Sequence, residues 1–301
     1  MSKSKNQHWV PQFYLREFAT PDTRDTKQPK VWIFSRDDKD GDEKLTWIRN
    51  VCAQRYLYSP KAADGERSWK VDDDLEGVEM LLAQLWSEIS SDFIDLANET
   101  IRKALSLFIA TNHVRHPANI KMVKEIHRQM LQFYETLPKN SYGTPDISSF
   151  SFNGKDYPLD TSDWHSYRKW DENDHHHFFV KRIRTDAGHL AKIILRKRWS
   201  VVFTDKPHFI TSDQPVILQN FEKERFGFGT PGSIISFPLS PTRVLIMDDR
   251  HEEPPNQYYQ LLPANLGGYN LSIWRESTRF MITGRAIPDV LNEIVSWSER
   301  D

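Results

Sequence analysis

The chain has 301 residues and a single cysteine, Cys52. One cysteine excludes an internal disulfide, and it excludes a zinc site built from several cysteines. Scarce cysteine is typical of a reducing compartment, and the opening MSKSKNQHW lacks the apolar stretch of a secretory signal. The sequence therefore predicts a cytoplasmic protein.

Long apolar runs and a surplus of positive charge are absent as well. No apolar run approaches the roughly 20 residues of a membrane span, so we expect no membrane partner. The net charge is −2, which excludes the global positive field that many nucleic-acid-binding domains carry. Any binding of nucleic acid must come from local patches, for which LRKRW (195–199) is a candidate.

Several well-known catalytic motifs are missing too. The chain contains neither a zinc-binding HExxH nor a GxSxG nucleophile motif before a helix. GFGTPGS (227–233) is rich in glycine but lacks the Lys-Ser/Thr that follows a phosphate loop, so we interpret it as a hairpin turn. No base stands near Cys52 in the sequence, so a thiol nucleophile is unsupported.

Tryptophan, by contrast, is abundant, with ten residues in the chain. Two interpretations are open. The indole rings can fill a core rich in aromatic residues, where each N–H needs a partner, or they can line a surface that stacks nucleobases. The proportions of apolar and charged residues, 38% and 27%, indicate an ordered chain with a sizeable core.

Hydrophobic periodicity divides residues 1–301 into regions of one domain. Short strand-like runs mark the first 60 residues, where VWIFSR and LTWIRN flank the acidic turn DDKDGDEK and RYLYS forms a third strand. Apolar residues then recur at steps of three and four, which predicts a helical region over about 73–196. Within it we expect a hairpin at SFSFNGKDYPL and helices over about 73–90, 92–111, 118–136 and 163–196, the last broken near DENDHHH.

The pattern returns to β structure after the helical region. WSVVFT, HFITS, SIISFPLS and TRVLIMD are short apolar runs bounded by turn residues, which predicts a mostly antiparallel sheet over 199–250. Helices return over 258–298, with one strand, STRFMIT, between them. Because helices and strands are segregated along the chain and do not alternate, we predict an α+β fold.

The opening HWVPQFYLREF (8–18) resembles the His-x-Val-Pro-x-x-Tyr-Leu-x-x-Phe signature of the bacterial domain-of-unknown-function family 4238. Further segments resemble motifs of that family in the same order and span almost the whole chain: RYLYS, NHVRHP, HFITSDQPVI, FPLSPTRVLIM and the segment that follows Asn270. Some members of the family look like single-gene anti-phage defence factors. The resemblance therefore implies a role in phage defence, through abortive infection, and it leaves the reaction open.

Five side chains are candidates for chemistry: His8, Glu79, Arg115, Asp213 and Asn270. His8 comes first because a neutral imidazole can act as base, acid or metal ligand near pH 7. The other interpretation is that His8 bonds to a backbone group and anchors the N-terminus to the body of the protein. Asn270 is a candidate on the family resemblance alone.

Asp213 and Glu79 are the candidate metal ligands. Asp213 follows a strand, where a carboxylate is well placed as a ligand or general base, but Ser-Asp-x-Pro is also a turn whose side chains cap backbone N–H groups. Glu79 lies one helical turn after Glu76, so both carboxylates share a face. They can hold a divalent cation such as Mg²⁺, or they can simply face solvent.

Arg115 stands with His113 and His116 at the predicted end of a helix. Arginine and histidine together can grip a phosphate group. The same residues can instead close the helix C-terminus electrostatically. The sequence leaves both interpretations of this cluster open.

Two histidine patterns look less informative. His175–His177 are consecutive, and successive residues of a helix point about 100° apart, so they cannot face one ion together. Arg184 and His189, or Arg182 and His189, match the Arg-x4–6-His spacing of ribonucleases of the HEPN (higher eukaryotes and prokaryotes nucleotide-binding) type. So short a pattern is common by chance.

Two hypotheses for the function remain. In the first, the five candidates converge in one cleft that hydrolyses a phosphodiester or nucleotide, with or without a divalent metal, and the partner is nucleic acid or a nucleotide. In the second, they are structural contacts, and the tryptophans with LRKRW bind a phage protein or nucleic acid. An open polar cleft would favour the enzyme, and burial in backbone hydrogen bonds would favour the binding module.

Overall fold

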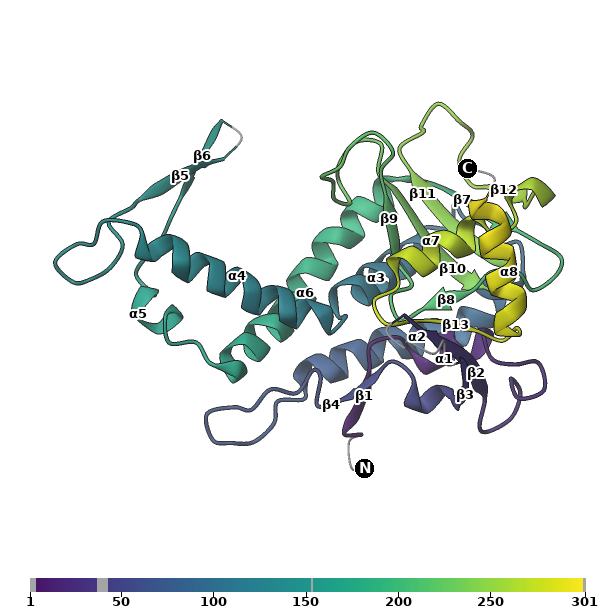
Figure 1. The fold of residues 1–301 in the computed structure, drawn as a ribbon, viewed down its shortest axis with the longest axis horizontal. Coiled ribbons are helices and arrows are strands. Elements are labelled where there is room, and N and C mark those ends of the chain that lie inside the picture. Colours follow the sequence, from purple (N-terminus) through teal and green to yellow (C-terminus); the bar gives the residue numbers. More distant parts are fainter. Residues whose placement is uncertain (1–3, 37–42, 153, 300–301) are drawn as a thin grey trace.

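The computed structural model describes residues 4–36, 43–152 and 154–299. They form a body of sheets packed with helices and an arm that extends away from it (Figure 1). The predicted α+β fold is confirmed. The acidic turn predicted between the first two strands falls on residues 37–42 and lies outside the described residues.

The larger sheet comes mostly from the region predicted to form it. Its strands lie in the order β12 (Gln257–Gln260), β7 (Arg198–Phe203), β11 (Arg243–Asp248), β10 (Ile234–Ser240) and β9 (Ile217–Gln219). Neighbours are antiparallel except β12 and β7, so the mostly antiparallel sheet is confirmed. The GFGTPGS segment lies in the connection between the antiparallel neighbours β9 and β10.

The second sheet joins the two ends of the chain. Its antiparallel strands lie in the order β3 (Glu43–Trp47), β2 (Lys30–Ser35), β13 (Phe280–Thr283) and β8 (Thr211–Ser212). The helices α7 (Gly268–Glu276) and α8 (Ile287–Ser298) pack with this sheet around the fully buried Ile273, Met281 and Val290. A late strand is therefore held between an N-terminal strand and the strand that leads into Asp213.

Two sequence predictions about strands are wrong. A separate two-stranded ribbon pairs β1 (Asn6–His8) with β4 (Ala53–Arg55). RYLYS is therefore not a strand of its own, since only its first residue belongs to β4 and Tyr56, with a positive φ of 57°, turns the chain. The segment predicted as helical from residue 258 begins as the edge strand β12, where two adjacent tyrosines favour extended backbone. A 3₁₀ turn at Pro263–Asn265 then precedes α7.

The helical region follows the predicted periods. Its helices are α2 (Lys70–Ser91), α3 (Glu99–Val114), α4 (Ala118–Glu135), α5 (Trp164–Tyr167) and α6 (Glu172–Arg196), with the hairpin β5 (Ser149–Phe152) and β6 (Lys155–Pro158) between α4 and α5. α3 begins later than the predicted Asp92, because the Asn98 side chain accepts two N–H groups of the first turn. The break near DENDHHH is confirmed, since Asp171 and Asp174 form a capping box there.

Four of the ten tryptophans are buried, and the other six are partly buried. None of the ten is exposed, and Trp9, Trp86 and Trp199 are each at most 2% exposed. They do not form the exposed stacking surface considered from the sequence. Among the helices of the described ranges, none has both the length and the apolar character to span a membrane.

The basic run LRKRW is not a surface patch either. Lys197 is buried, and its ammonium donates to Asp249 at 2.8 Å. Arg198 is also buried and makes a bidentate pair with Asp248, at 2.8 and 2.6 Å. Two of the three cations of this run are thus paired inside the body, whereas Arg196 is exposed. Binding of a partner by this run stays a prediction.

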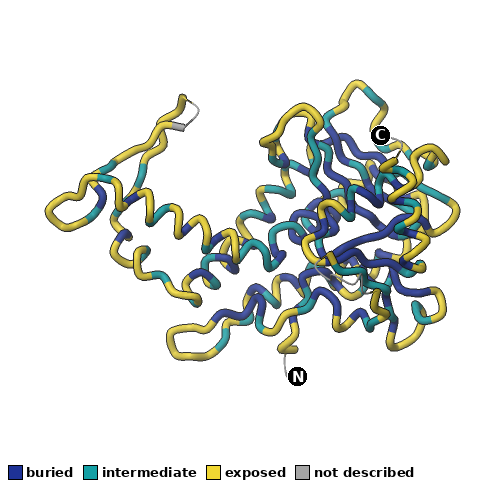
Figure 2. The backbone as a smooth tube through the Cα atoms, in the orientation of Figure 1, coloured by how far each residue is buried: buried dark blue, intermediate teal, exposed yellow. Residues whose placement is uncertain are grey.

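The arm consists of α4, the β5–β6 hairpin, α5 and the start of α6 (Figure 1). It is largely exposed, whereas the strands of the body are buried (Figure 2). On its inner side, the His127 imidazole lies 2.9 Å from the carbonyl oxygen of Tyr167 and 2.9 Å from the His175 imidazole. The arm thus has its own small interior between α4, α5 and α6.

Gly284 follows β13 and lies against Ala19, near the start of the chain. A Cβ at this position would lie 2.4 Å from the carbonyl oxygen of Ala19. We expect Gly284→Ala to lower the free energy of unfolding by more than about 2 kcal/mol, as strained substitutions do. Urea denaturation measures it.

Gly188→Ala is the matched control, since a Cβ there meets nothing within 4 Å. Gly188 lies inside α6, so alanine should raise the stability by up to about 1 kcal/mol through helix propensity. Equal effects of the two substitutions would contradict the close approach at Gly284.

Candidate functional site

The opening segment is anchored in the body. Trp9 is 2% exposed, and its indole N–H donates to the carbonyl oxygen of Asp213 at 3.0 Å. Tyr14, on α1 (Gln12–Glu17), places its hydroxyl 2.7 Å from that of Thr211. These partners stand 204 and 197 positions later in the chain. These aromatic residues of the opening segment therefore bind it to β8 and the turn after it.

Arg115 lies at the end of α3 and is 1% exposed. Its Nη1 donates to the Glu79 carboxylate at 2.5 Å, and its Nε donates to the carbonyl oxygen of Trp9 at 2.8 Å. Its Nη2 donates to the Asn112 side chain at 3.2 Å. The guanidinium thus joins α2, the opening segment and α3. Its Nε, Nη1 and Nη2 atoms all have partners within the protein.

Glu79 and His8 line one groove between the opening segment and α2. The groove has a volume of about 590 Å³, and the Glu79 side chain is 29% exposed. Tyr58 also lines it, and its hydroxyl donates to the carbonyl oxygen of Arg115 at 3.2 Å. We call this hollow the acidic groove, because α2 adds Asp72 and Glu76 to its wall.

The three carboxylates give the acidic groove a negative wall. Asp72, Glu76 and Glu79 recur at steps of four and three, so one face of α2 carries them. Neither lysine nor arginine is among the described residues that line the groove. A phosphate group would meet repulsion here unless a cation came with it. Within the described residues, no group of three or more His, Cys, Asp or Glu side chains is arranged to hold a metal ion.

His8 presents a neutral imidazole to the acidic groove. Burial lowers the pKa of His8, a hydrogen bond with the carbonyl oxygen of Arg49 raises it, and the charge of Arg115 lowers it, with a net shift downward. Its Nε2 donates to that carbonyl at 3.2 Å, so Nδ1 is the nitrogen that can accept a proton. His8 therefore anchors the opening segment through its Nε2 and can also act as a base through its Nδ1.

Asp213 lies beneath the opening segment and does not line the groove. It is 0% exposed, and its Oδ1 accepts N–H groups of Thr278 and Phe280 at 3.0 and 3.5 Å. Its Oδ2 lies 3.7 Å from Nε2 of the buried His116. The carboxylate caps the backbone before β13, while the Ser212 hydroxyl caps the local turn.

Asn270, on α7, is likewise 0% exposed and outside the groove. Its Oδ1 accepts the N–H of Ile210 at 3.1 Å, and its Nδ2 donates to the carbonyl oxygen of His208 at 3.0 Å. Both hydrogen bonds go to the chain that leads into β8. The contacts of Asn270 hold α7 against that segment.

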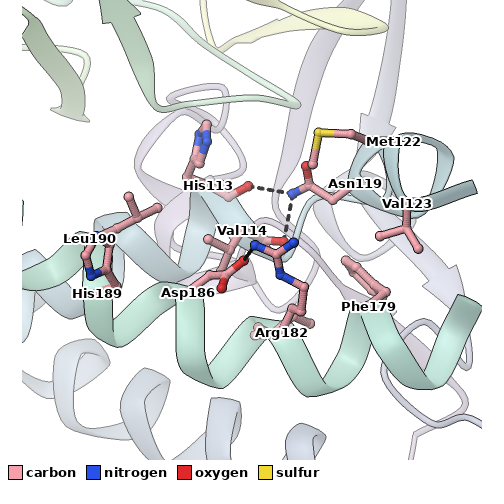
Figure 3. A pocket seen from close by; sticks show the side chains of 11 residues that line it. His113, Val114, Asn119, Met122, Val123, Phe179, Arg182, Asp186, His189 and Leu190 are labelled. Atoms are coloured by element: carbon pink, nitrogen blue, oxygen red, sulfur yellow. Dashed lines mark hydrogen bonds and ion pairs between the residues drawn. The ribbon is translucent and has the colours of Figure 1, made fainter. Parts of the chain in front are cut away.

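A second hollow, of about 280 Å³, lies among α3, α4 and α6 (Figure 3). His113 lines it from α3, and Arg182, Asp186 and His189 line it from α6. Arg182 pairs with Asp186 at 2.7 Å, whereas Arg184 pairs with α2. Of the two Arg–His spacings noted in the sequence, only Arg182 and His189 therefore share a pocket.

The three consecutive histidines point to three different partners, as helix geometry predicts. His175 contacts the His127 imidazole at 2.9 Å. His176 contacts the carbonyl oxygen of Leu57 at 2.8 Å, and His177 contacts that of Lys61 at 2.6 Å. They tie α6 to α4 and to the chain after β4.

Sequence reasoning missed Asn112, Tyr58 and the contact of His116 with Asp213. Asn112 accepts a hydrogen bond from the side chain of Arg115, and Tyr58 donates one to its backbone carbonyl. The His116 ring also packs edge-on against Trp9, with centroids 5.8 Å apart. All three stand inside the segments NHVRHP and RYLYS. Their place in recurring motifs was the available signal, but the motifs do not say which side chains meet.

The contacts just described connect the opening segment, the end of α3, the Ser-Asp turn and Asn270, which are widely separated in the sequence. The family described as "protein of unknown function (DUF4238)" matches residues 6–285, which include all of these segments. The chain belongs to the DUF4238 family. No curated protein and no solved structure matches it.

Asn270→Ala should lower the stability of the DUF4238 protein. The substitution leaves a buried N–H at Ile210 and a buried carbonyl at His208 without their partner. Each unsatisfied group costs about 1–3 kcal/mol, so we expect a loss of about 2–6 kcal/mol in the free energy of unfolding. Asn270→Asp keeps the acceptor and loses the donor, and its measured loss in urea denaturation should be different in size. A variant as stable as the wild type would contradict this role.

His113 should make the stability depend on pH. Burial, helped by the nearby His116, lowers the pKa of His113 to about 4. The folded state then binds fewer protons than the unfolded state, so this contribution is present above about pH 6.5 and is lost as the pH falls toward 4. Over that window the free energy of unfolding should fall by up to about 3 kcal/mol relative to the His113→Gln variant. A difference between the two proteins that stays constant with pH would contradict the expectation.

Proposed function

We propose that this DUF4238 protein hydrolyses a phosphodiester or nucleotide bond and acts in the cytoplasm as an effector of phage defence by abortive infection. The observation that carries the reaction is that an imidazole with a lowered pKa, His8, and a carboxylate, Glu79, line one open groove. The role in defence rests on the family resemblance, and the reaction class rests on the groove.

His8 is the general base in this proposal. Its Nδ1 takes a proton from the attacking water, whose oxygen bonds to phosphorus as the bond to the leaving oxygen breaks, and the leaving oxygen takes a proton from solvent. The hydrogen bond from Nε2 to the carbonyl oxygen of Arg49 keeps the ring in one tautomer. Arg115 is a positioning residue. It donates hydrogen bonds to the Glu79 carboxylate and to the backbone of Trp9, next to His8. One buried guanidinium thus positions both Glu79 and His8.

A divalent cation such as Mg²⁺ would reconcile an anionic substrate with the acidic groove. Mg²⁺ is commonly held by one or two carboxylates together with the phosphate groups of a substrate. Glu79 and Glu76 offer two carboxylates one turn apart on α2. Asp213 and Asn270, which are buried in backbone contacts, keep β13 and α7 in place in this scheme.

The test is incubation of the purified protein with DNA, RNA and nucleoside triphosphates in the presence of Mg²⁺, Mn²⁺ or EDTA. We expect a metal-dependent product from at least one substrate class. His8→Gln keeps a donor for the Arg49 carbonyl and removes the base, so its rate should fall about 10²-fold or more. Glu79→Gln should also lose activity, and both variants should fail to protect cells from phage.

His189→Ala is the matched control, because His189 is exposed and lines the other pocket. It should keep the wild-type rate. An inactive His189→Ala beside an active His8→Gln would move the chemistry to the pocket on α6 and overturn the proposal. The absence of any product would also count against it.

The pH dependence gives a further check on the same site. A general base works when it is deprotonated, and the pKa of His8 lies below its usual 6.5. The midpoint of the acid limb of kcat/KM should therefore lie below pH 6.5. A midpoint above pH 6.5 would exclude His8 as the base.

A second candidate function is recognition of a phage component, and the shape of the arm favours it. The arm extends away from the body, and α4 carries Met122, Ile126 and Phe133, each between 46% and 51% exposed. These apolar side chains recur along one helix at steps of four and seven. Substitution of this stripe with polar residues should then abolish protection in cells while hydrolysis by the purified protein persists.

A further inference from the structure

The arm contains a pocket of about 430 Å³ that the proposed hydrolysis does not use. It lies among α4, residues 160–163, α5 and the start of α6, at a distance from the acidic groove (Figure 1). Five aromatic rings line it: Tyr134, Trp164, Tyr167, Trp170 and Phe178. We call this cavity the arm pocket.

The rings of the arm pocket form a continuous wall. Trp164 meets Tyr134 with centroids 4.8 Å apart, Tyr167 meets Trp170 at 4.7 Å, and Trp170 meets Phe178 at 5.2 Å. These contacts are edge-on or tilted, with interplanar angles of 71°, 64° and 50°. The rings therefore do not form one parallel stack, and all five line the same space.

Carboxylates complete the lining of the arm pocket. Asp160 and Asp163 both line it, and hydrogen bonds with Ser162 lower the pKa of Asp160, which keeps that carboxylate ionised at neutral pH. Among the described residues that line the pocket, neither lysine nor arginine occurs. The space therefore combines aromatic walls with negative charge at its edge.

One ring of the arm pocket already holds a cation of the chain itself. The Lys139 ammonium lies 5.7 Å from the centroid of Trp164, within the range of a cation–π contact. That ammonium also pairs with Glu135 at 3.2 Å and donates to the carbonyl oxygen of Tyr134 at 2.9 Å, and Lys139 itself is not among the residues that line the pocket. The electron-rich face of an aromatic ring is thus used for a positive charge at this end of the pocket.

We propose that the arm pocket binds a methylated ammonium group. Aromatic faces attract a cation through their quadrupoles, and the methyl groups suit apolar walls, whereas a bare ammonium is strongly hydrated and would lose more on entering. Asp160 and Asp163 supply the compensating charge. Such a group can belong to a free quaternary amine or to a methylated lysine of a partner protein.

Calorimetric titration of the full chain with choline, and with its uncharged isostere 3,3-dimethyl-1-butanol, tests the charge requirement directly. The two probes have nearly the same shape, and only choline carries the positive charge. We expect choline to bind at least about tenfold more tightly, which is the difference expected from a partly desolvated cation–π site. Equal binding of the two probes, or no binding of either, would overturn the proposal.

Variants locate the site. Asp163 is exposed, so Asp163→Asn should fold normally, and it should weaken choline binding several-fold. Trp170→Leu removes a wall and should abolish binding. Asp22→Asn, at an exposed position on the body, is the control and should bind as the wild type does. Choline binding that survives both Trp170→Leu and Asp163→Asn would show that the probe sits elsewhere and would overturn the assignment.

Peptides distinguish the two sources of the ligand. A trimethyllysine peptide is compared with choline, and the same peptide with unmodified lysine serves as its control. Tighter binding of the trimethylated peptide than of choline indicates a protein partner, and the reverse order indicates a free amine. Equal affinity for the modified and unmodified peptides would contradict recognition of a methylated ammonium.

Discussion

The buried guanidinium of Arg115 is the contact on which the rest of the structure depends. It ends α3, holds α2 through Glu79, and holds the opening segment through the backbone of Trp9. An unpaired buried charge costs about 3–5 kcal/mol, so each partner is strongly constrained. Because the same contact orients the acid of the groove and the backbone next to His8, the stability of this region and the geometry of its site have one physical cause.

The structure places the five candidate residues in different environments, which their residue types alone do not reveal. Glu79 and His8 reach an open, polar space, whereas Asp213 and Asn270 are completely buried and bonded to backbone N–H and carbonyl groups. Arg115 belongs to the interior but acts on the groove. Candidate residues of one site can thus differ in environment, with some open to a groove and others buried in backbone hydrogen bonds.

The sequence predicted much of the fold because its patterns are local. The steps of three and four in α2 and α3 indicate one buried helix face, and the short apolar runs of β7 and β11 between turn residues indicate buried strands. Neither pattern requires knowledge of the partner segment. The pairing of β13 with β2 and the capping of residues 278–280 by Asp213 were beyond reach, since both join segments far apart in the chain. For the same reason the sequence named Arg115 and Glu79 separately but not as a pair.

The position of β13 has a consequence for the order in which the protein can fold during synthesis. β2 and β3 lie near the N-terminus, yet β2 has no neighbour on its other side until residues 280–283 have left the ribosome. The hydrogen bond of Asp213 with Thr278 and the close contact of Ala19 with Gly284 also form only after this late segment has been made. Most of the chain is therefore made before its second sheet can close. Such non-local pairing slows folding, and the interval before closure leaves β2 as an open edge that a chaperone can recognise.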